Sequence, residues 1–291
     1  MNEIYRKTAT EIVNLLKGKK ISPLEVVEHA ITRIEAIDHQ VNALPIRCFE
    51  RARKQAKTLN NIPRTNSDKY LYGLPIAVKD YNDVSGVRTT YGSPIYSNHV
   101  PSESDATVAR LEQNGAIPIA KSNVPEWAGG HTFNPVFGTT RNPWNTNMSA
   151  GGSSGGSAAA LATGMVWLAT GNDLGGSLRT PAAFNGVVGL RPGPGIVPRG
   201  KRLQPFDTLW VEGPMARNIS DLALMLDAGV GHVKEDPLSF SNTGLLYTSA
   251  LKNNGHPKRV AFSKDLNVVN VSRDIAEITK KSAQKITQMG L

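Results

Sequence analysis

Residues 149–191 read SAGGSSGGSAAALATGMVWLATGNDLGGSLRTPAAFNGVVGLR, and the rest of the chain is interpreted from this stretch. It contains two glycine–serine turns, one with Ser153 and one with Ser177, 24 residues later. A short helix former, residues 158–163, and an apolar strand-like run, residues 165–170, separate the turns. Glycines beside each serine let backbone N–H groups converge on a ligand. The stretch therefore predicts two serines presented on tight turns next to regular elements.

Three interpretations compete on the residues alone. A flexible Gly/Ser linker would not continue directly into an alanine-rich helix and a buried-looking strand. A phosphate-binding loop would need the Gly-Lys-Ser/Thr ending that is missing here. Residues 151–155 fit the G-x-S-x-G nucleophile elbow of hydrolases, but that elbow follows a strand, and residues 145–149 are polar and turn-like.

Composition and charge exclude several classes of protein. Of the 291 residues, 40% are hydrophobic and 20% charged, which is ordinary for a globular protein, and no apolar run is long enough to cross a bilayer. The start of the chain lacks a signal-peptide core, and the single cysteine, Cys48, suits a reducing compartment. We therefore expect a cytoplasmic protein without membrane contact, in which Cys48 is a packed thiol and not a nucleophile.

The net charge of +9 raises the question of nucleic-acid binding. Residues 61–180, which hold the serine turns, carry 8 basic and 8 acidic side chains, so the excess lies in the flanks. The densest basic cluster, residues 51–57, is typical of the solvated face of a helix, and no basic platform interleaved with aromatic residues is present. We expect no nucleic-acid partner.

The order of the remaining elements predicts an α/β domain with at least partly parallel strands. Helices are expected after caps at Thr8, Ser22, Ser104 or Asp105, and Asn218, and also over residues 52–59 and 272–289. Strands are expected over residues 71–78, 116–120, 165–170 and 259–262. Residues 61–69 and 123–145 are predicted loops, and the second carries large side chains that either line a pocket or anchor the loop: Trp127, His131, Phe133 and Phe137.

Several of these motifs resemble the amidase signature family of amide hydrolases. The resemblance lies in GGSSGGSAAALA at 151–162 and GNDLGGSLRTPAAFNGVVGLRP at 171–192. It continues in GLPIAVKD at 73–80, which resembles the family's lysine motif, and in residues 138–145 and 212–217. These blocks follow one another in the family's order over about two thirds of the chain.

The resemblance implies a mixed, partly parallel central sheet flanked by helices. Residues 1–291 would form a single domain, with a helical lead-in over residues 1–60 packed on a catalytic α/β core over residues 61–291. Family members continue well past residue 291, so we expect this domain to lack its C-terminal part, and the chain to be either poorly soluble or soluble but weakly active.

The resemblance also implies roles for three residues. Ser177 would be the acylated nucleophile, Ser153 a proton-relaying serine that follows a cis Gly152–Ser153 peptide bond, and Lys79 the general base. None of the six histidines sits in a motif-like setting, and a lysine can replace histidine if burial keeps it neutral. Lys79 ends an apolar strand, and the adjacent Asp80 should point to the opposite face of the sheet.

The remaining site residues lie around the second turn. The oxyanion would be held by backbone N–H groups there, with Gly152 close by, and Asp173 and Arg179 would hold the turn. The expected N–H donors are those of Leu174, Gly175, Gly176 and Ser177. Asn172 stands where the family often has a small hydroxyl residue, a departure that we expect to leave the other site residues untouched. No metal or cofactor is expected.

The expected reaction is hydrolysis of a small-molecule carboxylic amide to an acid and ammonia or an amine. Two other classes stay open. The chain could be the amidase subunit of a glutamine-dependent amidotransferase, or an inactive scaffold. A homodimer is a further expectation.

Overall fold

The computed structural model describes residues 4–60, 67–241, 244, 246–252 and 259–288. The chain divides into two compact units, Met1–Thr248 and Ser249–Leu291. Each unit is described by itself.

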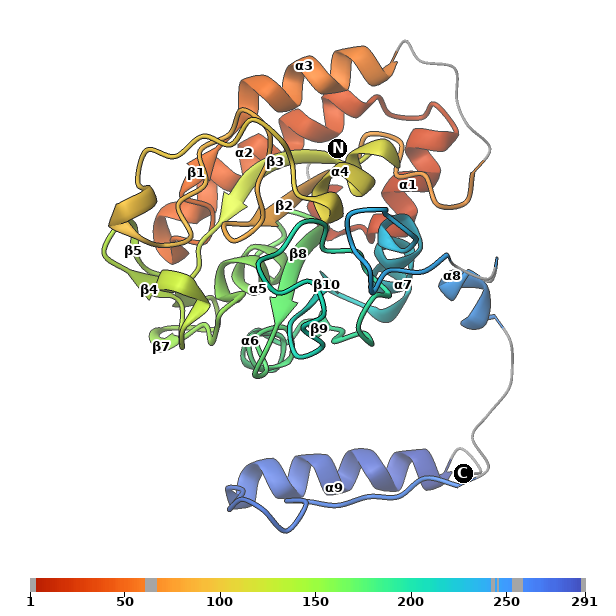
Figure 1. The fold of residues 1–291 in the computed structure, drawn as a ribbon. Helices are drawn as coiled ribbons and strands as arrows, with labels where there is room; N and C mark the ends of the chain where they lie inside the picture. Colours follow the sequence, from red (N-terminus) through yellow and green to blue (C-terminus); the bar gives the residue numbers. More distant parts are fainter. Residues whose placement is uncertain (1–3, 61–66, 242–243, 245, 253–258, 289–291) are drawn as a thin grey trace. The chain divides into compact units, whose positions relative to one another are not determined.

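The first unit is built on a six-stranded mixed sheet (Figure 1). In spatial order its strands are β1 (Ile46–Arg47), β3 (Ile117–Ser122), β2 (Pro75–Lys79), β8 (Leu168–Asp173), β10 (Val211–Ala216) and β9 (Val188–Gly189). The three strands β3, β2 and β8 are parallel, while β1, β10 and β9 join antiparallel. This arrangement confirms the predicted partly parallel sheet. It brings the ends of β2 and β8, and therefore Lys79 and Asp173, to the same edge.

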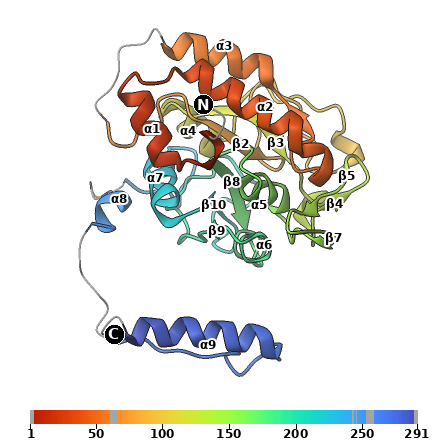
Figure 2. The ribbon, with the colours of Figure 1, turned by 180° about the vertical axis from the view of Figure 1, so that it is seen from behind.

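Helices cover this sheet. They are α1 (Ala9–Lys17), α2 (Pro23–Val41), α3 (Phe49–Asn60), α4 (Ala106–Gln113), α5 (Gly155–Ala162), α6 (Arg179–Asn185) and α7 (Ile219–Gly229). The short helix α8 (Tyr247–Ala250) spans the boundary between the two units. The predicted caps at Thr8 and Ser22 are both capping boxes, completed by Glu11 and Glu25. α2 packs against α3 and β2, and α3 also packs against β3, along one side of the unit (Figure 2).

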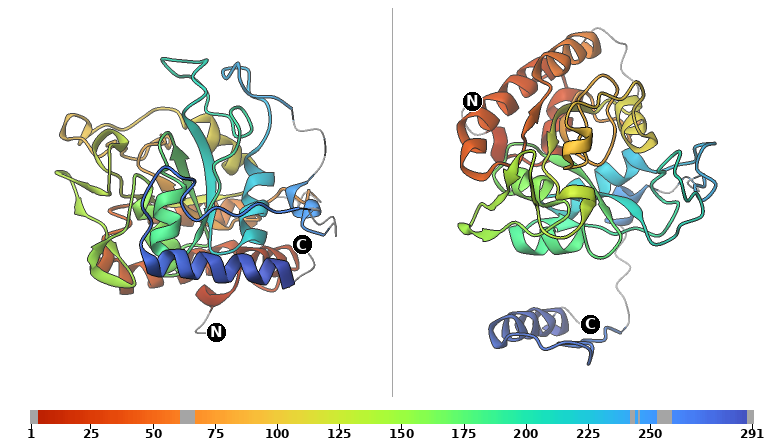
Figure 3. Two further views of the ribbon diagram at one scale, coloured as in Figure 1. Left: turned by 90° about the horizontal axis from the view of Figure 1, so that it is seen from below. Right: turned by 60° about the vertical axis from the view of Figure 1, so that its left-hand side comes forward.

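The helix α5 begins directly after the first serine turn and is packed into the unit. Every residue of α5 except Ala162 is buried, and the helix packs against β2, β3, β8 and β10. Alanine and glycine side chains let it approach the sheet closely. The helices α5 and α7 both pack against the strand β10 (Figure 3). The serine turn is therefore attached to the most heavily buried helix of the unit.

The smaller elements fill the connections. They are three 3₁₀ turns, η1 (Ile4–Arg6), η2 (Pro94–Tyr96) and η3 (Glu126–Ala128), and two hairpins, β4 (Phe133–Asn134) with β5 (Gly138–Thr139) and β6 (Arg141–Asn142) with β7 (Asn145–Ser149). The prediction that residues 145–149 are only turn-like is wrong, because this polar segment pairs with β6. It does not join the central sheet.

Several predicted boundaries shift. The predicted strand 71–78 begins only at Pro75, because Tyr72 and Gly73 adopt left-handed backbone conformations that a strand cannot contain. The strand predicted at 116–120 continues to Ser122 and therefore includes Lys121. The strand predicted at 165–170 runs from Leu168 to Asp173. Most of the predicted loop 61–69 lies outside the described residues.

The second unit contains the helix α9 (Arg273–Gln288), close to the predicted 272–289. The strand predicted at residues 259–262 is wrong, since these residues are irregular and exposed, and no strand of the described part of this unit lies beside them. α9 exposes Ile275, Ile278 and Ile286. Within the described residues, no helix is both long and apolar enough to span a bilayer.

Candidate active site

Lys79, the last residue of β2, is the most unusual charged residue of the first unit. Its side chain is completely buried. Its Nζ lies 2.7 Å from Ser153 Oγ, and it donates to Asn172 Oδ1 at 2.5 Å. Burial lowers the pKa of Lys79 to about 7, although the negative charges of Glu212 and Asp173 act to raise it. Burial therefore favours the neutral form of the Lys79 amine.

Asp80 points away from this cluster, as strand alternation predicts. Its carboxylate accepts from Lys121 Nζ at 2.9 Å and from the hydroxyl of Thr90 at 2.5 Å. Asp80 is thus committed to a separate ion pair, and it does not neutralise Lys79.

Ser153 lies on a turn that requires glycine before it. The Gly152–Ser153 peptide bond is cis, as the family resemblance implied. A Cβ atom at Gly152 would lie 2.3 Å from the carbonyl oxygen of Gly130 and 2.8 Å from the Cα of His131. No larger residue fits there without moving the backbone, so the loop at 130–131 fixes the position of Ser153.

Ser177 lies on the turn between β8 and α6 and is partly exposed. The Ser154 N–H donates to the Ser177 carbonyl at 3.3 Å, which holds the two serine turns side by side. Gly176 has a φ of +118°, a backbone conformation that side-chain-bearing residues rarely adopt. Among the described residues, none forms a hydrogen bond with the Ser177 hydroxyl.

The buried Asp173 organises the second turn. It accepts from the N–H groups of Gly176 (2.8 Å) and Leu178 (3.1 Å), from Arg179 Nε (3.0 Å) and from Arg191 Nη1 (3.0 Å). Burial raises the pKa of Asp173, but the hydrogen bonds from Arg179, Gly176 and Leu178 outweigh it and hold that pKa below its ordinary value. The Gly176 N–H, predicted to be available to an oxyanion, is instead engaged by this carboxylate.

Sequence reasoning missed two neighbours of Lys79. Asn172 was expected to leave the other site residues untouched, yet its side-chain carbonyl is a direct partner of Lys79. Glu212, on β10, is completely buried and is the cross-strand partner of Asn172. Its polar position inside an otherwise apolar strand, residues 211–216, is the signal that could have identified it.

The predicted pocket residues divide into two groups. Trp127 is 46% exposed and stacks on Tyr91, with ring centroids 5.9 Å apart, and His131 is exposed beside Gly152. Phe133 is exposed as well. Phe137, by contrast, packs against the core under the guanidinium of Arg88, so it anchors its loop.

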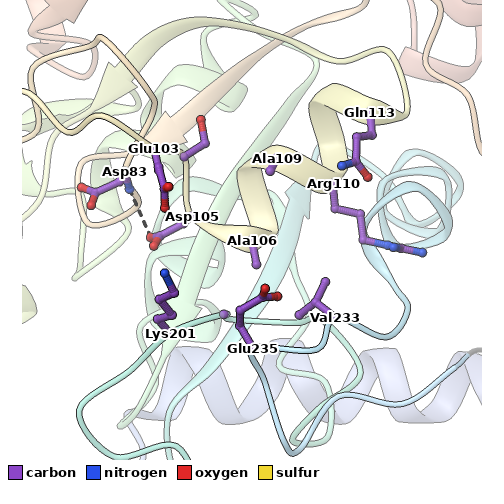
Figure 4. A pocket seen from close by; sticks show the side chains of 12 residues that line it. Asp83, Glu103, Asp105, Ala106, Ala109, Arg110, Gln113, Lys201, Val233 and Glu235 are labelled. Carbon is purple, nitrogen blue, oxygen red and sulfur yellow. Dashed lines mark hydrogen bonds between the residues drawn. The ribbon is translucent and has the colours of Figure 1, made fainter.

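A separate cavity of about 530 Å³ lies beside α4, and neither serine lines it (Figure 4). Its lining is rich in charge, including Asp83, Asp105, Lys201 and Glu235. Burial raises the pKa of Asp105 to about 6, and Glu212 and Asp83 add to this while Arg202 opposes it. The Asp83 N–H donates to Asp105 Oδ2 at 3.1 Å (Figure 4).

The mixed sheet is flanked by helices, and within it the buried Lys79 contacts Ser153, the residue after Gly152. A family model described as Amidase matches residues 25–291. The chain belongs to the amidase signature family.

Its relatives include the A subunit of the glutamyl-tRNA(Gln) amidotransferase of Moorella thermoacetica, 37% identical over 99% of this chain and 60% of that protein. The corresponding protein of Thermoanaerobacter pseudethanolicus is 33% identical over 99% of this chain and 59% of its own length. Among solved structures, a bacterial aryl acylamidase is 33% identical with a TM-score of 0.89, covering 97% of this chain and 59% of the other. The chain thus spans about 60% of the length of these relatives.

Proposed function

We propose that this chain hydrolyses a carboxylic amide through an acyl-enzyme on Ser177. The observation that carries the proposal is the 2.7 Å contact between the Nζ of the completely buried Lys79 and Ser153 Oγ. A neutral amine there accepts the Ser153 proton, and Ser153 takes the Ser177 proton as the Ser177 oxygen attacks the amide carbonyl.

The later steps use the same atoms in reverse. The carbon–nitrogen bond of the tetrahedral intermediate breaks, and the leaving ammonia or amine takes its proton from Ser153 while Lys79 returns one to Ser153. Water then adds to the ester carbonyl and gives a proton to Ser153, whose own proton passes to Lys79. The bond between the carbonyl carbon and Ser177 Oγ breaks, Ser177 takes a proton back from Ser153, Lys79 returns one to Ser153, and the acid leaves. Backbone N–H groups of Leu174, Gly175 and Ser177 remain available for the oxyanion, since that of Gly176 donates to Asp173.

The substrate class has two candidates. A row of aromatic rings begins two residues after Lys79. The ring centroids of Tyr81 and Tyr91 are 5.5 Å apart, and those of Tyr91 and Trp127 are 5.9 Å apart. Such a row favours an amide with an aromatic or flat apolar group, in line with the aryl acylamidase among the similar structures. The names of the amidotransferase relatives favour the second candidate, release of ammonia from glutamine for a partner enzyme.

A fluorophosphonate probe tests the central proposal, because it reacts with activated serines. We expect an adduct on Ser177, identified by mass spectrometry, and its loss in Ser177→Ala. Lys79→Arg should also abolish the adduct, since a guanidinium stays protonated. An adduct on Ser153 or Ser154 would overturn the roles. A folded protein that forms no adduct would favour the scaffold interpretation.

A panel of amides separates the two substrate classes. Turnover of anilides above that of glutamine would favour the acylamidase candidate. Turnover of glutamine that rises when a partner protein co-purifies would favour the amidotransferase candidate.

A further inference from the structure

Asn172 connects Lys79 to a second buried charge. In the antiparallel pairing of β8 with β10, Asn172 is directly opposite Glu212, so the two side chains stand on the same face of the sheet. The Asn172 carbonyl oxygen accepts from Lys79 Nζ at 2.5 Å. Its amide nitrogen is buried, and it donates no hydrogen bond within the described part of the chain. Asn172 itself is 1% exposed.

The chemistry of a neutral lysine makes this contact important. A neutral amine has two N–H bonds and one lone pair, and it can accept a proton from Ser153 only if the lone pair faces the Ser153 hydroxyl. An acceptor at residue 172 takes one N–H and cannot compete for the lone pair, whereas a hydroxyl there could either donate or accept. The amide of Asn172 has the right polarity only when its carbonyl faces Lys79.

Glu212 supplies a reason for that orientation. Its carboxylate accepts from Trp210 Nε1 at 3.0 Å, from Asn82 Nδ2 at 3.1 Å and from Arg202 Nη2 at 3.4 Å. A negative charge beside the amide attracts its NH₂ end and repels its carbonyl end. The carbonyl of Asn172 then turns toward Lys79.

We propose that Asn172 is a positioning residue for Lys79. Glu212 orients the amide of Asn172, and the Asn172 carbonyl in turn directs the lone pair of the neutral Lys79 amine at Ser153. The proposal rests on the proposed function, because it assigns Lys79 the role of base. Without Asn172 the amine rotates, and without Glu212 the amide of Asn172 loses its preferred direction.

The charges around Lys79 define what the variants should do. Two negative charges act on Lys79. One is that of Glu212 on β10, which is paired with Arg202, and the other is that of Asp173 on β8. Asp173 is paired with Arg179 and Arg191. The Lys121–Asp80 pair lies on the other side of β2, and α5, which also packs on β2, has no titratable side chain.

Four variants of the full chain test the proposal. Asn172→Asp places a carboxylate on Lys79, Asn172→Leu removes the acceptor at similar size, and Glu212→Gln removes the orienting charge. Asn142→Asp makes the Asn-to-Asp change at a buried asparagine that bonds the carbonyls of Ser149 and Phe184 instead. Two readouts are followed against pH: the rate of fluorophosphonate labelling of Ser177, and the titration of Lys79 by NMR of ¹³C-lysine protein, assigned with Lys79→Met.

We expect Asn172→Asp to move both midpoints to higher pH, because a carboxylate within about 4–6 Å raises a lysine pKa by about 1–3 units. Labelling at pH 7 should then fall about 5-fold or more, because the neutral fraction of Lys79 falls by that factor for a rise of about one pKa unit. Glu212→Gln should move both midpoints to lower pH. Asn172→Leu should slow the limiting labelling rate about 10-fold at every pH without weakening probe binding. Asn142→Asp should leave the Lys79 midpoint unchanged.

Unchanged Lys79 midpoints in Asn172→Asp and Glu212→Gln, with an unchanged limiting rate in Asn172→Leu, would overturn the proposal. Failure of the proposed function looks different: the wild-type chain would not label at Ser177 at all. The NMR titration reports on Lys79 in either case, and it also identifies a variant that has failed to fold. If Asn172→Asp does not fold, the Lys79 midpoint in Glu212→Gln and the limiting labelling rate in Asn172→Leu test the proposal.

Discussion

Lys79 and Lys121 are both completely buried on the neighbouring parallel strands β2 and β3, but they have opposite partners. Lys121 donates to the carboxylate of Asp80 at 2.9 Å, whereas Lys79 contacts the neutral side chains of Ser153 and Asn172. Val78, not Lys79, is directly opposite Lys121, so the two amines stand on different faces of the sheet. One lysine is therefore suited to hold structure and the other to exchange protons.

Lys79→Met should stabilise the first unit at neutral pH. The pKa of Lys79 is lowered to about 7 in the folded chain from 10.5. The unfolded chain therefore binds the extra proton between these values, and stability from this group rises with pH across that window. At about 1.4 kcal/mol per pKa unit, the lowering of the pKa from 10.5 to about 7 corresponds to a gain of about 4–5 kcal/mol at pH 7 in the variant. Urea unfolding between pH 6 and pH 10 measures this gain. If the free energy of unfolding changes with pH equally in the wild-type chain and in Lys79→Met, the pKa of Lys79 is not lowered in the folded chain.

The same substitution at Lys121 should have the opposite effect. Lys121→Met leaves the carboxylate of Asp80 buried without its ion pair, and such a loss costs about 3–5 kcal/mol. The free energy of unfolding at pH 7, measured beside Lys79→Met, checks this. Because both changes remove one buried amine, a similar effect of the two would show that the partners of the lysines do not decide their energetics.

Asp173→Asn should loosen the Ser177 turn and remove part of the acid sensitivity of the fold. The folded pKa of Asp173 is lowered, so its stabilisation is present above the unfolded value of about 3.9 and is lost as the pH falls below that value. We expect a loss of about 3 kcal/mol at pH 7, since Arg179 and Arg191 lose a buried partner. Labelling of Ser177 should fall as well. The measurement is the free energy of unfolding of the wild-type chain and of Asp173→Asn at pH 7 and at pH 3. If this free energy changes between the two pH values by the same amount in both proteins, Asp173 does not have this role.

The sequence predicted the sheet and the serine turns because their signals are local. Glycines at 152 and 176 are required by backbone geometry, and the apolar run before Lys79 identifies the strand that carries it. The contacts among Lys79, Ser153 and Asn172 join residues more than 70 positions apart, so only the family resemblance suggested the first of them.

What the sequence could not supply depends on tertiary pairing. The strand predicted at 259–262 has the right composition, but it has no neighbouring strand in the described part of its unit. The role of Gly176 was misjudged because the carboxylate that takes its N–H becomes a partner only once the turn is folded. The contact of Asn172 with Lys79 needs the register of β8 beside β2, which a single sequence does not reveal.

Gly152→Ala and Gly175→Ala form a matched pair that tests how tightly the first turn is held. A Cβ at residue 152 would lie 2.3 Å from the Gly130 carbonyl oxygen and 2.8 Å from the Cα of His131, whereas a Cβ at residue 175 has nothing within 4 Å. Backbone atoms cannot yield as a flexible side chain can, so Gly152→Ala must displace Ser153 or the loop at 130–131. A shift of about 1 Å at a reacting group lowers rates by about 100-fold. We expect Gly152→Ala to slow fluorophosphonate labelling of Ser177 by about that factor, and Gly175→Ala to change it less than threefold. Circular dichroism and thermal unfolding show whether each variant is folded. If folded Gly152→Ala labels as fast as the wild-type chain, the position of Ser153 does not limit the reactivity of Ser177.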